Sequence, residues 1–151
     1  MKGTKRFDEA IKKLYTAFYN KDLNPEDCTA CAVGNILDRR DFWKYLSDDH
    51  GSLQLNYVGQ FHEMRGKTFN GYLPSELLQI EQAFLEGCGY ELPYRHNHKK
   101  PKNPTDSAVL FNGLCGVIAL LCRLDGLVNV LEYQNLFDLS RQPSRGFEPI
   151  R

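Results

Sequence analysis

Two cysteines in a C-x-x-C spacing are the residues of this chain whose types and separation best suit chemistry. Cys28 and Cys31 follow Pro25, which suits a first helical position, and the two acidic residues after Pro25 suit a first helical turn. The pattern therefore predicts a helix from Pro25 to about Leu37 with both thiols near its start. Two thiols three residues apart on a helix share one face, so both can reach one metal ion or each other.

A metal site is the first interpretation of this pair. A helix N-terminus favours the thiolate form of cysteine, which is the form that binds metal. Two thiolates supply half of a tetrahedral zinc site, and His50 and His62 are the candidates for the other two ligands. Zinc is therefore the predicted metal. An iron–sulfur cluster is the alternative, and it would recruit Cys88 or Cys115 instead.

Two other interpretations of the pair stay open. The thiols could perform redox exchange, although no βαβ pattern flanks them as in a thioredoxin-like fold. Cys28 and Cys31 could also be two small residues that only pack a helix, in which case the chain could serve as a non-catalytic protein-interaction module. No phosphate-binding glycine loop, zinc-protease helix or calcium loop is present in the sequence, so the sequence alone names no reaction.

Composition limits the class of protein. The chain has 151 residues, which is one ordinary domain, and 19 basic residues balance 19 acidic ones. A balanced charge gives no overall attraction to nucleic acid or to an anionic membrane, so the basic segment from Arg95 to Lys102 fits a solvated loop better than a nucleic-acid site. A protein partner stays open.

Cysteine count and hydropathy indicate a compartment. Five cysteines is an odd number, which argues against a secreted disulfide framework. The basic N-terminus leads into an amphipathic segment rather than a signal peptide, and the longest apolar run, Val117 to Cys122, is too short to span a bilayer. We therefore expect a cytoplasmic protein that does not enter the membrane.

Helical periodicity recurs along the chain and predicts an all-α fold. Apolar residues three and four positions apart, together with caps and glycine stops, predict helices over about residues 5–19, 25–37, 41–46, 53–64, 75–87, 106–124 and 129–137. The segment 106–124 is apolar nearly all round, which is typical of a buried helix. The sequence thus predicts one bundle of six or seven helices around this segment, with residues 1–140 as a single domain and residues 141–151 as a flexible tail.

Three strings occur together in this sequence: CAVGNIL from Cys31, LSDDHGSLQL from Leu46 and ELLQIE from Glu76. With them the chain resembles a family of short uncharacterised bacterial proteins, over about Phe7 to Phe137. Some members are labelled as the flavin-containing component of a sodium-translocating NADH:quinone reductase. That label implies a ferredoxin-type cluster with flavin and nicotinamide domains. This chain is shorter than those parts require and lacks the plant-type C-x4-C-x2-C run, so no functional residue is transferred from it.

Overall fold

Helices make up the regular structure of this chain. A computed structural model describes residues 4–49, 51–92, 97–128 and 130–137. Within these ranges there is no β-strand, and the helices are α1 (Lys5–Tyr19), α2 (Ala32–Ile36), η1 (Phe42–Leu46), α3 (Tyr57–Met64), α4 (Pro74–Cys88), α5 (Ser107–Leu124), α6 (Val130–Gln134) and η2 (Asn135–Phe137), where η marks a 3₁₀ helix. The all-α prediction is confirmed. The predicted tail, residues 141–151, lies outside the described residues.

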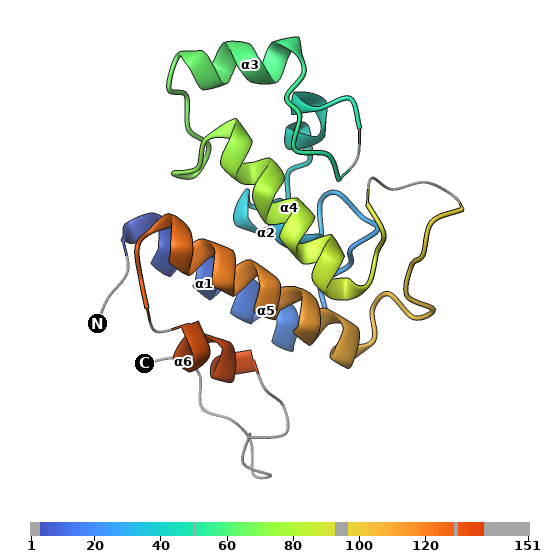
Figure 1. Cartoon of the computed structure of the whole chain (residues 1–151). Coiled ribbons are helices and arrows are strands. Elements are labelled where there is room, and N and C mark those ends of the chain that lie inside the picture. Colours follow the sequence, from blue (N-terminus) through green and yellow to red (C-terminus); the bar gives the residue numbers. More distant parts are fainter. Residues whose placement is uncertain (1–3, 50, 93–96, 129, 138–151) are drawn as a thin grey trace.

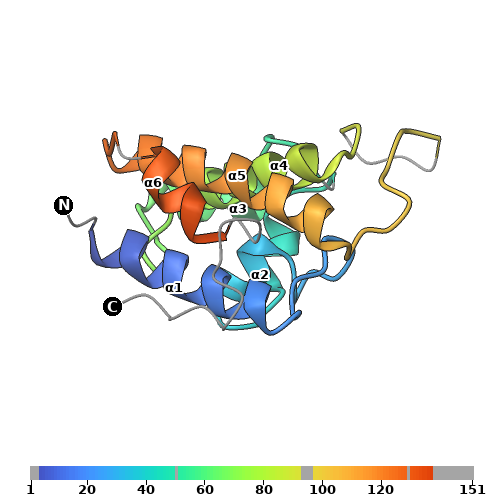
Figure 2. The ribbon, with the colours of Figure 1, turned by 90° about the horizontal axis from the view of Figure 1, so that it is seen from below.

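The helices form two layers. Figure 1 shows α4 and α5 side by side with α1 behind α5, and the turned view in Figure 2 places α1 and α2 on the opposite side from α4 and α5. The helix α5 contacts α4, α1 and α6, and α2 contacts both α1 and α4. One hydrophobic core therefore lies between the layers, and it draws buried side chains from α1, α2, α4 and α5.

The helix α5 is the predicted central helix. Its cap residue Asp106 accepts a hydrogen bond from the backbone N–H of Ala108 at 3.2 Å. A Cβ at Gly113 would lie 3.0 Å from the ring of Phe84, so this glycine lets α5 approach α4 closely. By length and composition α5 could also cross a membrane, with a mean hydropathy of 1.9, but 44% of it is buried inside the fold and core helices pass the same test.

The helix predicted from Pro25 is wrong over its first half. The helix α2 begins only at Ala32, and Cys31 is its N-cap. The side chain of Asp27 accepts hydrogen bonds from the backbone N–H and the hydroxyl of Thr29, at 2.9 and 2.8 Å. Such local side-chain bonds give the backbone an alternative to helix, so the segment before Cys31 forms turns. The two cysteines therefore do not share a first helical turn.

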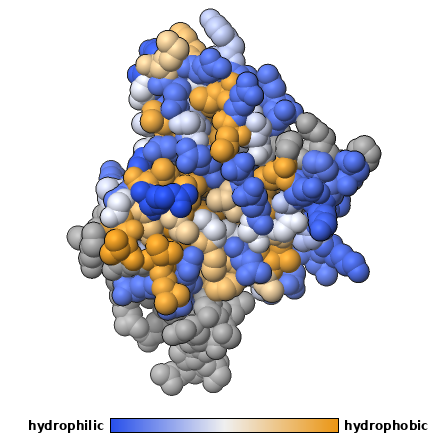
Figure 3. Space-filling view, viewed as in Figure 1, coloured by the Kyte–Doolittle hydropathy of each residue, from blue (hydrophilic) through white to orange (hydrophobic). Residues whose placement is uncertain are grey.

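The helix predicted over residues 53–64 is also shorter in the structure. The helix α3 begins at Tyr57 because the side chain of Asn56 caps it, accepting from the backbone N–H of Gly59 at 2.9 Å. Its apolar side chains face outward, with Tyr57 82%, Phe61 48% and Met64 85% exposed. Apolar residues accordingly appear on the surface at the end of the molecule where α3 lies (Figure 3).

The helix α4 begins and ends at neighbours of the predicted residues. Pro74 occupies the first position, and the Glu76 carboxylate accepts a hydrogen bond from the backbone N–H of Leu73 at 2.8 Å. The helix passes Gly87 and ends at Gly89, whose φ of 105° is a left-handed conformation that glycine adopts readily. The extra length keeps Cys88 within the helix, where it is buried.

Candidate thiol site

Cys28 and Cys31 lie in the turns that connect α1 to α2. Cys28 is half-buried, whereas Cys31 is only 1% exposed. The indole N–H of Trp43 in η1 donates to the backbone carbonyl of Cys28 at 3.1 Å, which fixes this turn against η1. A Cβ at Gly34 would lie 2.6–2.7 Å from the backbone of Thr29, so only glycine lets α2 pack this closely under the turn.

The sulfur of Cys31 is held by α2 itself. The backbone N–H of Gly34 donates to Cys31 Sγ at 3.3 Å, and the thiol lies 3.7 Å from the carbonyl oxygen of Cys28. The side-chain amide of the buried Asn35 donates to the carbonyls of Ala30 and Cys31, at 2.9 and 3.0 Å. These bonds fix the backbone on both sides of the thiol, so Cys31 has one defined position.

Glu81 is a buried carboxyl beside these thiols. It projects from α4, is 1% exposed and forms a hydrogen bond with the side chain of Cys31. Burial disfavours the charged carboxylate and raises its pKa to about 8, although the bond from Cys31 works in the opposite direction. At neutral pH this carboxyl is therefore mostly protonated, and it can both give and accept a proton near pH 8.

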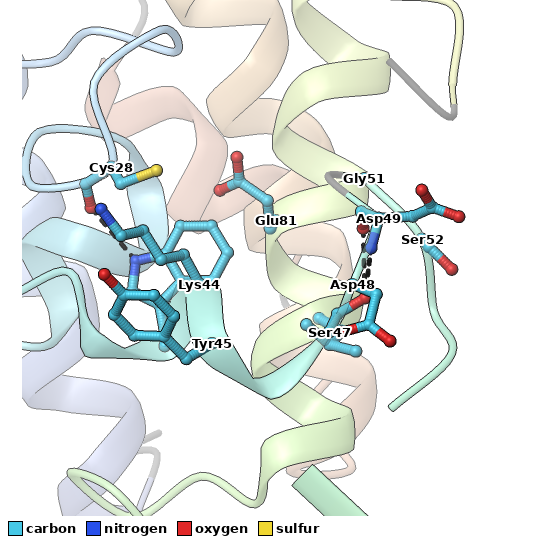
Figure 4. Close-up of a pocket in the computed structure, with 11 residues that line it drawn as sticks. Cys28, Lys44, Tyr45, Ser47, Asp48, Asp49, Gly51, Ser52 and Glu81 are labelled. Atoms are coloured by element: carbon cyan, nitrogen blue, oxygen red, sulfur yellow. Dashed lines mark hydrogen bonds between the residues drawn. The ribbon is translucent and has the colours of Figure 1, made fainter. Parts of the chain in front are cut away.

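A pocket of about 310 Å³ opens onto this carboxyl. It is lined by Cys28, Trp43, Lys44, Tyr45, Ser47, Asp48, Asp49, Gly51, Ser52, Leu78 and Glu81. Figure 4 shows Cys28 Sγ and the Glu81 carboxyl pointing toward one another, with Lys44 reaching across toward Cys28 and Asp48 and Asp49 on the other side. A molecule in the pocket can therefore contact a thiol, a carboxyl and an ammonium group together.

Burial, rather than the helix start, controls the pKa values of the two thiols. Desolvation raises the pKa of Cys28 and, more strongly, that of Cys31, and the nearby Glu81 raises both further. The N–H of Gly34 lowers the pKa of Cys31, as the sequence predicted for a helix start, but burial outweighs it. The prediction of two thiolates is therefore wrong, and both cysteines are thiols at neutral pH.

The structure does not bring the predicted metal ligands together. Within the described ranges, no group of three or more histidine, cysteine, aspartate or glutamate side chains is placed to hold a metal ion. His62 lies instead on α3 beside the rings of Phe61 and Phe69, with centroid distances of 5.8 and 5.7 Å. His50 is outside the described residues. Zinc and an iron–sulfur cluster therefore stay predictions that no observed ligand group supports.

Sequence reasoning missed Glu81, although the sequence contains a signal for it. Glu81 lies four residues after Leu77 and four before Leu85, so it sits on the apolar stripe of α4. A carboxylate on a buried stripe is rare, because burying it without a partner is costly. An acidic residue within such a stripe, in a chain that also has a C-x-x-C pair, therefore marks a candidate functional group.

Comparisons of the chain with protein-family models, with curated proteins and with solved structures found no match. The resemblance to the short bacterial family therefore stays a prediction. The functional argument for this chain rests on the geometry of Cys28, Cys31 and Glu81.

Proposed function

We propose that this protein is a thiol–disulfide exchange protein in which Cys28 attacks the substrate and Cys31 resolves the intermediate. One observation supports the proposal above the others. Cys28 is half-exposed and lines an open pocket, while Cys31, three residues later, is buried next to it. A disulfide entering the pocket can meet Cys28 first, and the product of that attack lies within reach of Cys31 alone.

The chemistry needs only a disulfide substrate. The Cys28 thiolate attacks one sulfur of the substrate, forms a mixed disulfide and releases the other sulfur as a thiolate. The Cys31 thiolate then attacks Cys28 Sγ, which forms the Cys28–Cys31 disulfide and releases the second substrate thiol. The protein loses two electrons and two protons, and the substrate disulfide gains them as two thiols.

The raised pKa values favour a protein that reduces its substrates. A dithiol is a strong oxidant when its thiolate form is stabilised, because that stabilises the reduced state. Cys28 and Cys31 have the opposite environment, since burial and the charge of Glu81 both raise the pKa of each thiol. We therefore expect a low reduction potential, so that the dithiol gives electrons to disulfides of small molecules or of proteins.

Cys31→Ser should trap the mixed disulfide on Cys28. The substitution is made in a Cys115→Ser background, because Cys115 is the other half-exposed thiol among the described residues. We expect oxidised glutathione to add one glutathione per chain to Cys28, and this adduct to persist because no resolving thiol remains. With Cys31 present, the adduct should not accumulate, and the Cys28–Cys31 disulfide should form instead. Mass spectrometry of intact protein and of its peptides measures both products.

Cys28→Ser in the same background is the matched control. It should form no adduct at Cys31, which is buried. Adduct formation at Cys31, or a Cys28 adduct that persists when Cys31 is present, would contradict the proposal. Elemental analysis of the untreated protein tests the zinc alternative, since about one zinc per chain that is lost on Cys28→Ser would show a metal site instead of a redox pair.

A further inference from the structure

We propose that Glu81 is the catalytic base of the resolving step and takes the proton from the Cys31 thiol. This inference rests on the proposed exchange activity and adds a third residue to it. Glu81 is placed for the role because its carboxyl, 1% exposed, forms a hydrogen bond with the Cys31 side chain. A base within hydrogen-bond reach of the proton it removes meets the geometric requirement for general base catalysis.

The surroundings of Glu81 leave Cys31 as its proton donor. From the turn before α2, Cys28 and Cys31 face the carboxyl, and both thiols sense its charge. From α4 itself, Cys88 also senses that charge, but it is buried at the far end of the helix and burial raises its pKa to about 12. Of these thiols, Cys31 is the one with a hydrogen bond to the carboxyl.

The charged groups at the pocket complete this environment. From η1, Lys44 lies near Cys28 and lowers the pKa of that thiol. From the loop after η1, Asp48 and Asp49 line the far side of the same pocket. These three groups lie on the solvent side, whereas the thiol–carboxyl pair lies below the pocket. A proton can therefore pass from Cys31 to Glu81 without leaving the protein.

The resolving step then balances within the site. The Glu81 carboxylate takes the proton of the Cys31 thiol, and the resulting thiolate attacks Cys28 Sγ. The sulfur–sulfur bond forms between the two cysteines as the bond from Cys28 to the substrate sulfur breaks. The departing substrate thiolate receives the proton from the Glu81 carboxyl, which returns to the carboxylate. Glu81 is thus base and then acid within one step.

Glu81→Gln separates catalysis from simple electrostatics because the two roles predict opposite signs. Removing the negative charge should lower the pKa of both thiols. If Glu81 only repelled thiolates, both steps of the reaction would become faster. If Glu81 is the base, attack by Cys28 should become a few-fold faster, while the resolving step should become roughly 10²-fold slower, within the usual contribution of a general base.

The probe is 2,2′-dithiodipyridine, which releases one coloured thiopyridone in each step. Rapid-mixing absorbance of the Cys115→Ser protein should show two phases, and Glu81→Gln should speed the first and slow the second. Glu86→Gln is the matched control, because Glu86 is an exposed glutamate of the same helix, and it should change neither phase. Loss of the first phase in the unsubstituted protein would contradict the exchange activity itself. A normal first phase with an unchanged or faster second phase in Glu81→Gln would contradict only the role of Glu81.

The pH profile of the protein without the glutamine substitution tests the role independently of how well Glu81→Gln folds. The second-phase rate should rise with pH as the Glu81 carboxyl ionises and should level off above about pH 8, where the pKa of Glu81 lies. A rate that keeps rising through that range would show that ionisation of Cys31 alone controls the step, and it would overturn the assignment.

Discussion

Leu114→Ala should lower the free energy of unfolding by about 2–5 kcal/mol, the range measured for leucine-to-alanine changes in protein cores. Leu114 is 0% exposed in the middle of α5, the helix that contacts α4, α1 and α6. Truncation removes buried methyl groups and leaves a cavity that the two layers cannot easily fill. For a domain of this size, the loss corresponds to a fall in melting temperature on the order of 10 °C.

Leu131→Ala is the matched control, because Leu131 in α6 is 70% exposed. The same chemical change at an exposed position should alter stability by less than about 0.5 kcal/mol. Denaturant unfolding followed by circular dichroism measures both variants. A loss below about 1 kcal/mol for Leu114→Ala would mean that α5 is not the centre of the core.

Arg6→Met should cost about 3 kcal/mol, near the lower end for breaking a buried ion pair, because Arg6 keeps 23% of its side-chain exposure. The Arg6 guanidinium donates to Asp125 at 2.9 Å, to Glu76 at 3.0 Å, to the Gly71 carbonyl at 2.9 Å and to the Leu124 carbonyl at 3.3 Å. It therefore joins the start of α1 to the end of α5 and the start of α4. Methionine keeps the apolar stem but leaves Asp125, with a side chain only 1% exposed, without its cation.

Two comparisons test this explanation. Lys44→Met breaks the exposed pair with Asp41, whose side chains are 39% and 43% exposed, and should cost less than about 1 kcal/mol. Adding Asp125→Asn to Arg6→Met should recover part of the loss, because the stranded carboxylate is gone. Chemical unfolding of all four proteins gives the values. An additive double variant would show that the cost of Arg6→Met comes from lost packing instead.

The fold was predictable wherever one local rule dominated. The apolar residues of α1 recur at three- and four-residue steps, and the helix spans Lys5–Tyr19 as predicted. The prediction failed at Pro25 because the acidic residues that suit a helix start also suit a turn, and the bonds from Asp27 to Thr29 favour the turn. It also failed for the inward face of α3, since periodicity defines an apolar side but does not show what that side contacts.

The candidate site was predictable only in part. The spacing of Cys28 and Cys31 identified the pair, but the difference in their burial depends on how α2 and η1 pack around the turn. Glu81 lies about 50 residues further along the chain, and only the contact between α2 and α4 brings it to Cys31. A contact of that kind leaves no local pattern in the sequence, so it appears first in the structure.

A redox titration of the folded protein tests the central claim most directly. The protein is equilibrated with mixtures of reduced and oxidised dithiothreitol, and peptide mass spectrometry follows the Cys28–Cys31 disulfide at each ratio. The proposed function predicts one two-electron transition, with a midpoint below the glutathione poise of about −220 to −260 mV because both thiol pKa values are raised. If Cys28 and Cys31 remain thiols in the most oxidising mixture while circular dichroism shows a folded protein, the pair is not a redox site and the account is wrong.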